Sequence, residues 1–209
     1  MAYALALAVV WGLQRGGLVS SAETGWLAPL VWVVAAVAAT WPLAGGSRDL
    51  FTARQWLGSL RETTRWLLLA GGVLIPFSAA YLLYQGWWTG RAIVPSIPDH
   101  FTAWLWYQLI YVGFPEELFF RGYLQQRFDD ALGRPHLFLG ARWGWGLVLA
   151  AGLFALGHWM VTGDVRRVSV FVPGLLFGWL LARTEALAAP VIAHAVCNSV
   201  LLLLQAWVR

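Results

Sequence analysis

The sequence predicts an all-α fold, a polytopic transmembrane helical bundle of six to seven spans. Hydrophobic residues make up 60% of the chain and charged residues only 11%, whereas an ordinary soluble domain carries about 25% charged residues. The apolar residues form continuous runs, not the alternating pattern of a transmembrane barrel. Many of the 15 tryptophans stand at the ends of these runs, as in the aromatic belts at membrane interfaces: Trp26, Trp41, Trp66, Trp87, Trp88, Trp143 and Trp207.

Seven apolar runs follow one another along the chain, and each is a candidate membrane span. One helix needs ~20 residues to cross a bilayer. The first, Met1–Leu13, lacks a basic leader and a convincing cleavage site, so we interpret it as a short or partial span and not as a signal peptide. Phe101–Phe128 is long and carries charges in its second half. The other five runs are Trp26–Leu43, Trp66–Trp88, Trp143–Val161, Val168–Leu181 and Ala186–Val208. We expect residues 1–100 to form N-terminal transmembrane helices with an interfacial loop. Residues 101–209 should form a C-terminal four-helix core, and the two parts one integrated membrane domain.

The net charge of +4 comes entirely from arginine, because the chain contains no lysine. The arginines are scattered over short loops and form no basic face, which argues against nucleic-acid binding and agrees with the positive-inside rule. The loop Ala44–Arg65 has amphipathic spacing and is predicted to lie along the lipid headgroups. A lysine-free composition rich in Arg, Ala, Gly and Trp is typical of high-GC bacterial genomes. We therefore expect a multi-pass protein of the bacterial inner membrane.

The fourth run contains the first of three groups of polar residues inside apolar helices. A charged group at the bilayer centre costs at least ~2.5–3.5 kcal/mol, so such a residue indicates a functional site. Glu117 and Arg121 are four residues apart with the acid first, the favourable order for an ion pair on a helix. Glu116 lies just after Pro115 on a different face and is left without a cation, as expected for a general base. In the alternative interpretation both acids merely pair with Arg121.

The other two groups lie on later helices. His158 stands near the end of an apolar run, and His194 and Asn198 share one face of the last run. Taken alone, these residues are also compatible with polar contacts that hold helices together, since unsatisfied polar groups in lipid are costly. Cys197 lies on another face and is interpreted as a small buried hydrophobe. His158 and Glu116 are each 21 residues from the middle of the hairpin between them, so symmetric helices would hold both at one depth.

The three motifs EExxxR, FxxxH and HxxxN, in this order on successive helices, resemble the CAAX-prenyl-protease and bacteriocin-processing family, also called CPBP, Abi or type II CAAX endopeptidases. The resemblance covers roughly Phe101–Arg209. The chain is short and rich in Trp, and in this it is also similar to the myxosortases, bacterial members of the family proposed to process C-terminal sorting signals. The motif residues are Glu116, Glu117, Arg121, Phe154, His158, His194 and Asn198.

The resemblance implies an intramembrane glutamate-type endopeptidase that cleaves a peptide bond in a membrane-associated protein or peptide. Glu116 and His158 would activate a water, and His194 and Asn198 would stabilise the oxyanion. Three residues would support the site: Glu117 and Arg121 by holding the helix in register, and Phe154 by shaping the pocket. The substrate would be a C-terminal sorting signal, a secreted peptide or a CAAX-like protein.

Three alternatives remain open. Glu116, His158 and His194 could bind zinc in a metal-dependent version of the same protease, because one carboxylate and two imidazoles are suitable zinc ligands; the resemblance favours a mechanism without a cofactor. A catalytically idle scaffold or immunity protein would use the same polar residues only to join helices. A transporter could use Glu and His as proton relays, but inverted repeats are not visible.

Overall fold

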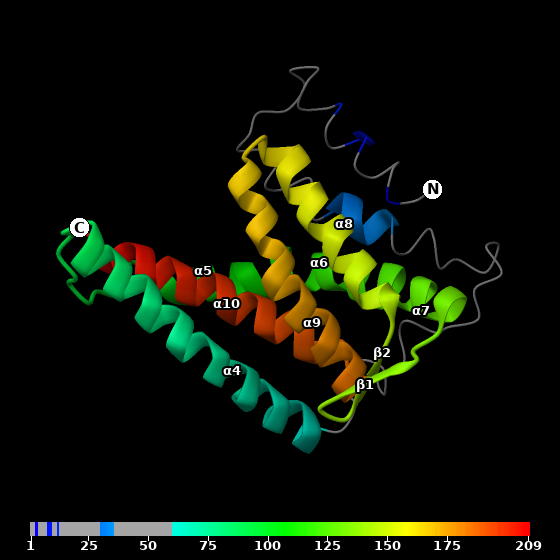
Figure 1. Cartoon of the computed structure of the whole chain (residues 1–209). Helices are drawn as coiled ribbons and strands as arrows, with labels where there is room; N and C mark the ends of the chain where they lie inside the picture. The colour runs from blue at the N-terminus through cyan, green and yellow to red at the C-terminus, as the bar shows by residue number, and fades with distance from the viewer. Residues whose placement is uncertain (1–2, 4–7, 10–11, 13–29, 36–59) are drawn as a thin grey trace.

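The computed structural model describes residues 3, 8–9, 12, 30–35 and 60–209. The described part is helical apart from a short β-hairpin and the connecting loops (Figure 1). Four of its helices are long and apolar enough to cross a membrane, as predicted for a membrane protein. These four cover Arg61–Trp88, Trp145–Thr162, Val165–Thr184 and Ala188–Trp207.

The expected spans Met1–Leu13 and Trp26–Leu43 lie largely outside the described residues, so the total of six to seven spans stays a prediction. The loop expected at Ala44–Arg65 is described only in its last six residues. These residues are already helical, because α4 runs over Leu60–Leu83 and continues as a π-helical turn over Tyr84–Trp88. The span that was expected to begin at Trp66 therefore begins one and a half turns earlier.

The longest helix is continuous over residues 101–132 and alternates between α-helical and π-helical turns. Its segments are α5 (Phe101–Tyr107), a π-helix (Gln108–Gly113), α6 (Phe114–Glu117), a second π-helix (Leu118–Gln125) and α7 (Gln126–Leu132). Pro115 lies in the first turn of α6. Proline has no N–H for the helical ladder and its ring crowds the preceding turn, which accounts for wider turns beside it. Pro115 thus coincides with a change of helical pitch within one helix, not with its end.

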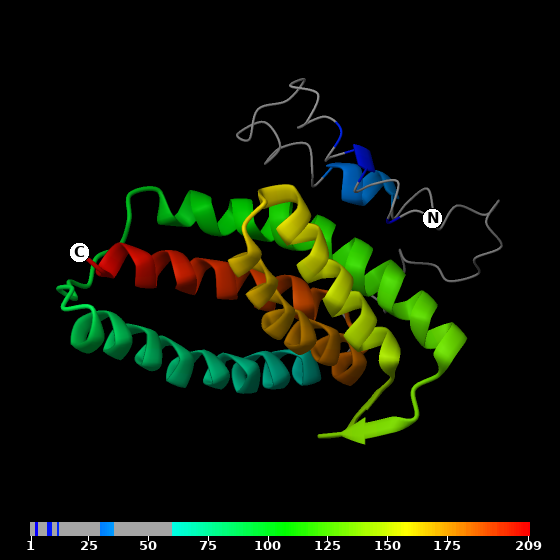
Figure 2. The ribbon, with the colours of Figure 1, turned by 45° about the horizontal axis from the view of Figure 1, so that its top comes forward.

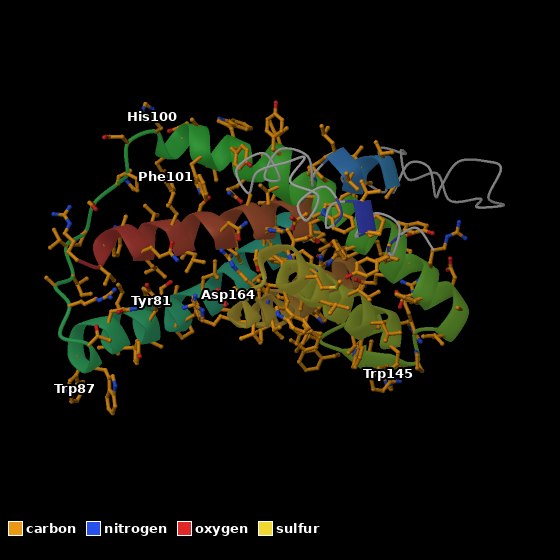
Figure 3. The ribbon with its side chains drawn as sticks, turned by 90° about the horizontal axis from the view of Figure 1, so that it is seen from above. Tyr81, Trp87, His100, Phe101, Trp145 and Asp164 are labelled. Atoms are coloured by element: carbon orange, nitrogen blue, oxygen red, sulfur yellow. The ribbon has the colours of Figure 1, made fainter. Side chains whose placement is uncertain are left out.

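Three helices lie side by side, with α10 (Ala188–Trp207) between α4 and the helix 101–132 (Figure 2). Helices α8 (Trp145–Thr162) and α9 (Phe171–Thr184) pack on each other and cross this layer. A 3-10 helix, Val165–Val170, joins them. The side chains of Trp87 and Trp145 project from opposite ends of the molecule (Figure 3), and both are exposed. Trp87 is one of the tryptophans predicted for the aromatic belts, whereas Trp145 is not.

Residues 136–143 form a feature that the sequence did not predict. Strands β1 (His136–Phe138) and β2 (Ala141–Trp143) pair antiparallel where only a loop was expected. Gly140, at a φ of 79°, supplies the left-handed conformation that the tight turn requires. The turn is short and its strands have three residues each, too few for a period of two to be read from the sequence.

Two hydrogen bonds fix the helix 101–132 against α9. The Arg121 Nη2 donates to the Gly174 carbonyl at 3.0 Å, and one turn further the Gln125 Nε2 donates to the Gly178 carbonyl at 3.0 Å. Both acceptors are glycines, and an added Cβ at Gly178 would lie 2.8 Å from Gln125 Oε1. The missing side chains therefore allow the two helices to approach until buried polar groups reach backbone carbonyls.

Candidate active site

The bundle brings together three side chains from three helices: Glu116 of α6, His158 of α8 and His194 of α10. The Glu116 Oε2 lies 4.0 Å from His158 Nε2 and 3.8 Å from His194 Nε2. These separations are too long for direct hydrogen bonds but suit one water that bonds to the carboxylate and an imidazole. The Glu116 Oε2 is buried and has no hydrogen-bond partner among the described residues. The predicted convergence of the motifs is therefore present in the structure.

The second nitrogen of each histidine determines which proton each ring carries. The His158 Nδ1 lies 3.0 Å from the Phe154 carbonyl, which can only accept, so Nδ1 carries a hydrogen. The His194 Nδ1 lies 2.8 Å from Glu117 Oε1, an oxygen of the carboxylate that pairs with Arg121. In the neutral rings both Nε2 atoms therefore turn a lone pair toward Glu116. Three proton acceptors meet at one point, an arrangement that binds and moves protons.

Glu117 and Arg121 form the predicted i,i+4 ion pair, and it is fully buried. The contacts are bidentate, with Arg121 Nη1 3.1 Å from Glu117 Oε1 and Arg121 Nε 3.1 Å from Glu117 Oε2. The same carboxylate also accepts the Nδ1 hydrogen of His194. Glu117 thus pairs with Arg121 on its own helix and also binds His194 of the site. The spacing of residues within one helix could not indicate the second contact.

Comparison with known proteins agrees with this geometry. Residues 98–200 match the family model described as type II CAAX prenyl endopeptidase Rce1-like. The chain belongs to this family. No curated protein and no solved structure matches the chain. The matched region contains every residue of the three motifs. Membership in the Rce1-like family indicates a membrane endopeptidase, and it supports the resemblance seen in the sequence.

Two phenylalanines line the site of this Rce1-like protein. The Phe154 ring lies edge-on to His158 at 4.4 Å between centroids, and the Arg121 guanidinium lies 4.6 Å from its centre. The Phe177 ring stacks on His194 at 5.0 Å and 16°. Phe154 was predicted to shape the pocket, whereas Phe177 was missed. One more aromatic residue in an apolar run carries no signal in the sequence that distinguishes it.

Asn198 makes a contact that its expected role did not indicate. Its only hydrogen bond among the described residues joins Asn198 Nδ2 to Gln108 Oε1 at 2.7 Å. Gln108 is buried in the π-helical turn before α6 and was not predicted to belong to the site. Its signal was available, since it is an uncharged polar residue inside a predicted span. The bond uses one of the two N–H groups of Asn198, and the second remains for a ligand.

The zinc alternative can be compared with the geometry of the same residues. Glu116, His158 and His194 offer an oxygen and two nitrogens, the ligand types of a catalytic zinc site. Within the described residues, no group of three or more His, Cys, Asp and Glu side chains has metal-binding geometry. His158 and His194 each have their Nδ1 held by a hydrogen-bond acceptor, as in many zinc sites. The set is chemically suitable for zinc, but the side chains would have to move inward to bind it.

Proposed function

We propose that this protein is an intramembrane glutamate-type endopeptidase that hydrolyses a peptide bond in a membrane-associated protein or peptide. The observation that carries the proposal is the buried Glu116 Oε2, which faces two histidine Nε2 atoms and has no hydrogen-bond partner in the part of the chain that the structure describes. Glu117 differs, because its Oε1 accepts hydrogen bonds from Arg121 Nη1 and from His194 Nδ1. An unbonded carboxylate beside two imidazoles is suited to a water whose proton it removes.

In the proposed reaction, Glu116 and His158 bind the water and one of them accepts its proton. The resulting hydroxide attacks the carbonyl carbon of the scissile amide, and the carbonyl oxygen becomes an oxyanion. The proton then passes to the amide nitrogen as the C–N bond breaks, which releases an acid and an amine. Phe154 packs against His158 and excludes water from one side of this group.

The oxyanion would be stabilised by His194 and by the second N–H of Asn198. For His194 Nε2 to donate, the ring must carry both protons, and the Glu117 carboxylate on Nδ1 compensates that charge. The Arg121 guanidinium pairs with the same Glu117 carboxylate. Arg121, Glu117 and His194 would therefore form one chain of charge-assisted hydrogen bonds that ends at the reacting atoms.

The substrate would be a C-terminal sorting signal, a secreted peptide or a CAAX-like protein, and the location a bacterial inner membrane. The decisive experiment compares the membrane proteomes of cells that carry the wild type, Glu116→Gln or Glu185→Gln. Glu185 is exposed between α9 and α10, so its variant is a matched control for loss of one carboxylate. An uncleaved membrane protein should accumulate only with Glu116→Gln. Identical proteomes at equal enzyme abundance would favour an idle scaffold instead.

A zinc-dependent version of the same protease is the second candidate, because two nitrogens and one oxygen converge without bonding one another. In that version Glu116, His158 and His194 would hold the ion, which would polarise the carbonyl and activate water. The two versions share the reaction and most of the residues. Removal of metal distinguishes them, as described below.

A further inference from the structure

A groove separate from the catalytic residues opens between α4, the β-hairpin, α8 and α9. It has a volume of about 900 Å³. Its walls are almost entirely apolar, and α9 contributes Leu175, Leu176 and Trp179. Phe177, between them in sequence, turns to the other side of α9 and stacks on His194. The groove and the site therefore use opposite faces of the same helix.

One end of the groove is marked by Trp66, which lines it. The guanidinium of Arg183 lies 4.6 Å from the centre of the Trp66 ring, and that of Arg65 lies 5.5 Å away. Both arginines approach the carboxylate of Glu62, at 3.5 Å and 3.9 Å, and the Trp66 Nε1 donates to the same carboxylate at 3.1 Å. Two cations thus share this carboxylate. The Arg183 Nε is also buried, without a hydrogen-bond partner in residues 60–209 or the few described residues before them.

The β-hairpin fixes this arrangement at the end of the groove. The Trp179 Nε1 donates to the Phe138 carbonyl at 3.2 Å, which holds β1 against α9. Gly140 at the turn lies under Arg183, where an added Cβ would meet the Arg183 Nε at 3.2 Å. Leu137, Phe138 and Leu139 of the hairpin line the groove and are more than half exposed. The hairpin therefore adds apolar surface below a cationic end.

From this arrangement we propose that the groove binds one anionic phospholipid. Its acyl chains would lie along the apolar walls, and its phosphate would bond to Arg65 and Arg183 beside the Trp66 ring. Three features fit this occupant better than a peptide segment. The groove is walled on one side by α4, a predicted membrane span, and its lining is apolar. Beside Trp66, two arginines share one carboxylate, which leaves a net positive charge there. Arginine on an aromatic ring is well suited to phosphate, because the planar fork bonds two oxygens while the ring covers its face.

The test measures lipid retention by native mass spectrometry of the full chain, purified and then exposed to phosphatidylglycerol or phosphatidylcholine. The wild type should retain one phosphatidylglycerol in preference to phosphatidylcholine. Arg65→Gln and Arg183→Gln should each lower that retention about tenfold, as expected for the loss of one charge-assisted contact. Arg91→Gln is the matched control, because Arg91 is exposed just beyond the other end of α4. It should retain lipid like the wild type.

A second pair of variants tests the apolar part without touching the arginines or their contact to Glu62. Val73→Trp fills the groove, since Val73 lines it, and should lower retention of phosphatidylglycerol. Ile75→Trp adds the same bulk on an exposed position of α4 that does not line the groove and should leave retention unchanged. Equal retention of both lipids by the wild type would overturn the proposal. So would equal effects of Arg91→Gln and the two groove arginine variants.

Discussion

Glu116 and Glu117 are adjacent in sequence and chemically identical, yet the same substitution should affect them differently. Glu117→Gln removes the charge that faces Arg121 and the acceptor of the His194 Nδ1 hydrogen. Arg121 is fully buried, and its other hydrogen bond within the described part of the chain goes to the Gly174 carbonyl. Breaking a buried ion pair by removing one partner costs about 3–5 kcal/mol, because the other charge remains without compensation. We expect a loss of this size in the free energy of unfolding.

Glu116→Gln should cost about 1 kcal/mol or less. No described residue hydrogen-bonds to the Glu116 Oε2, so no described buried group loses a partner with it. Removing this carboxylate should instead abolish peptide-bond cleavage, since the amide cannot accept the proton of water. The matched pair therefore separates a loss of stability at one position from a loss of activity at its neighbour.

The assay is reversible unfolding in mixed micelles of a mild detergent and SDS, followed by circular dichroism. A third variant, Glu117→Gln with Arg121→Met, removes both charges and should recover part of the loss, because it leaves no unpaired ion in the interior. Equal free energies of unfolding for the two single variants would refute the reasoning. The ion pair would then contribute nothing that is specific to its burial.

Three further predictions follow from the same contacts. Gly178→Ala should destabilise the protein by about 1–3 kcal/mol, because the added Cβ would lie 2.8 Å from Gln125 Oε1, whereas Gly152→Ala, with nothing within 4 Å, should not destabilise it in the same unfolding assay. Asn198→Ala should lower kcat about 10²–10³-fold, and Gln108→Leu should lower kcat less, with KM unchanged. If Gln108→Leu lowers kcat by the same factor in the wild type and in the Asn198→Ala variant, the two residues are not coupled. Activity should survive dialysis against a strong chelator, and a loss that added zinc restores would support the metal-dependent version.

The sequence was most informative where one helix contains both partners. The spacing of Glu117 and Arg121 predicted their ion pair, and the bidentate contact confirms it. It was least informative for Gln108 and Phe177. Each makes its contact with a residue on another helix, Asn198 and His194 respectively, so no periodicity within its own helix distinguishes it. The β-hairpin was missed for a related reason, because three-residue strands are shorter than any reliable pattern.

The sequence by itself determined that the chain is a helical membrane protein and that its polar residues fall into three motifs. Composition and the helical period suffice for both, because they depend only on neighbours along the chain. The tertiary structure decided which polar atoms meet. Glu117 reaches His194, 77 residues away, and leaves Glu116 facing both Nε2 atoms. Such contacts depend on how far helices approach and how each is rotated about its axis. Gly174 and Gly178 set that approach between the helix 101–132 and α9, since a side chain at either position would push the helices apart.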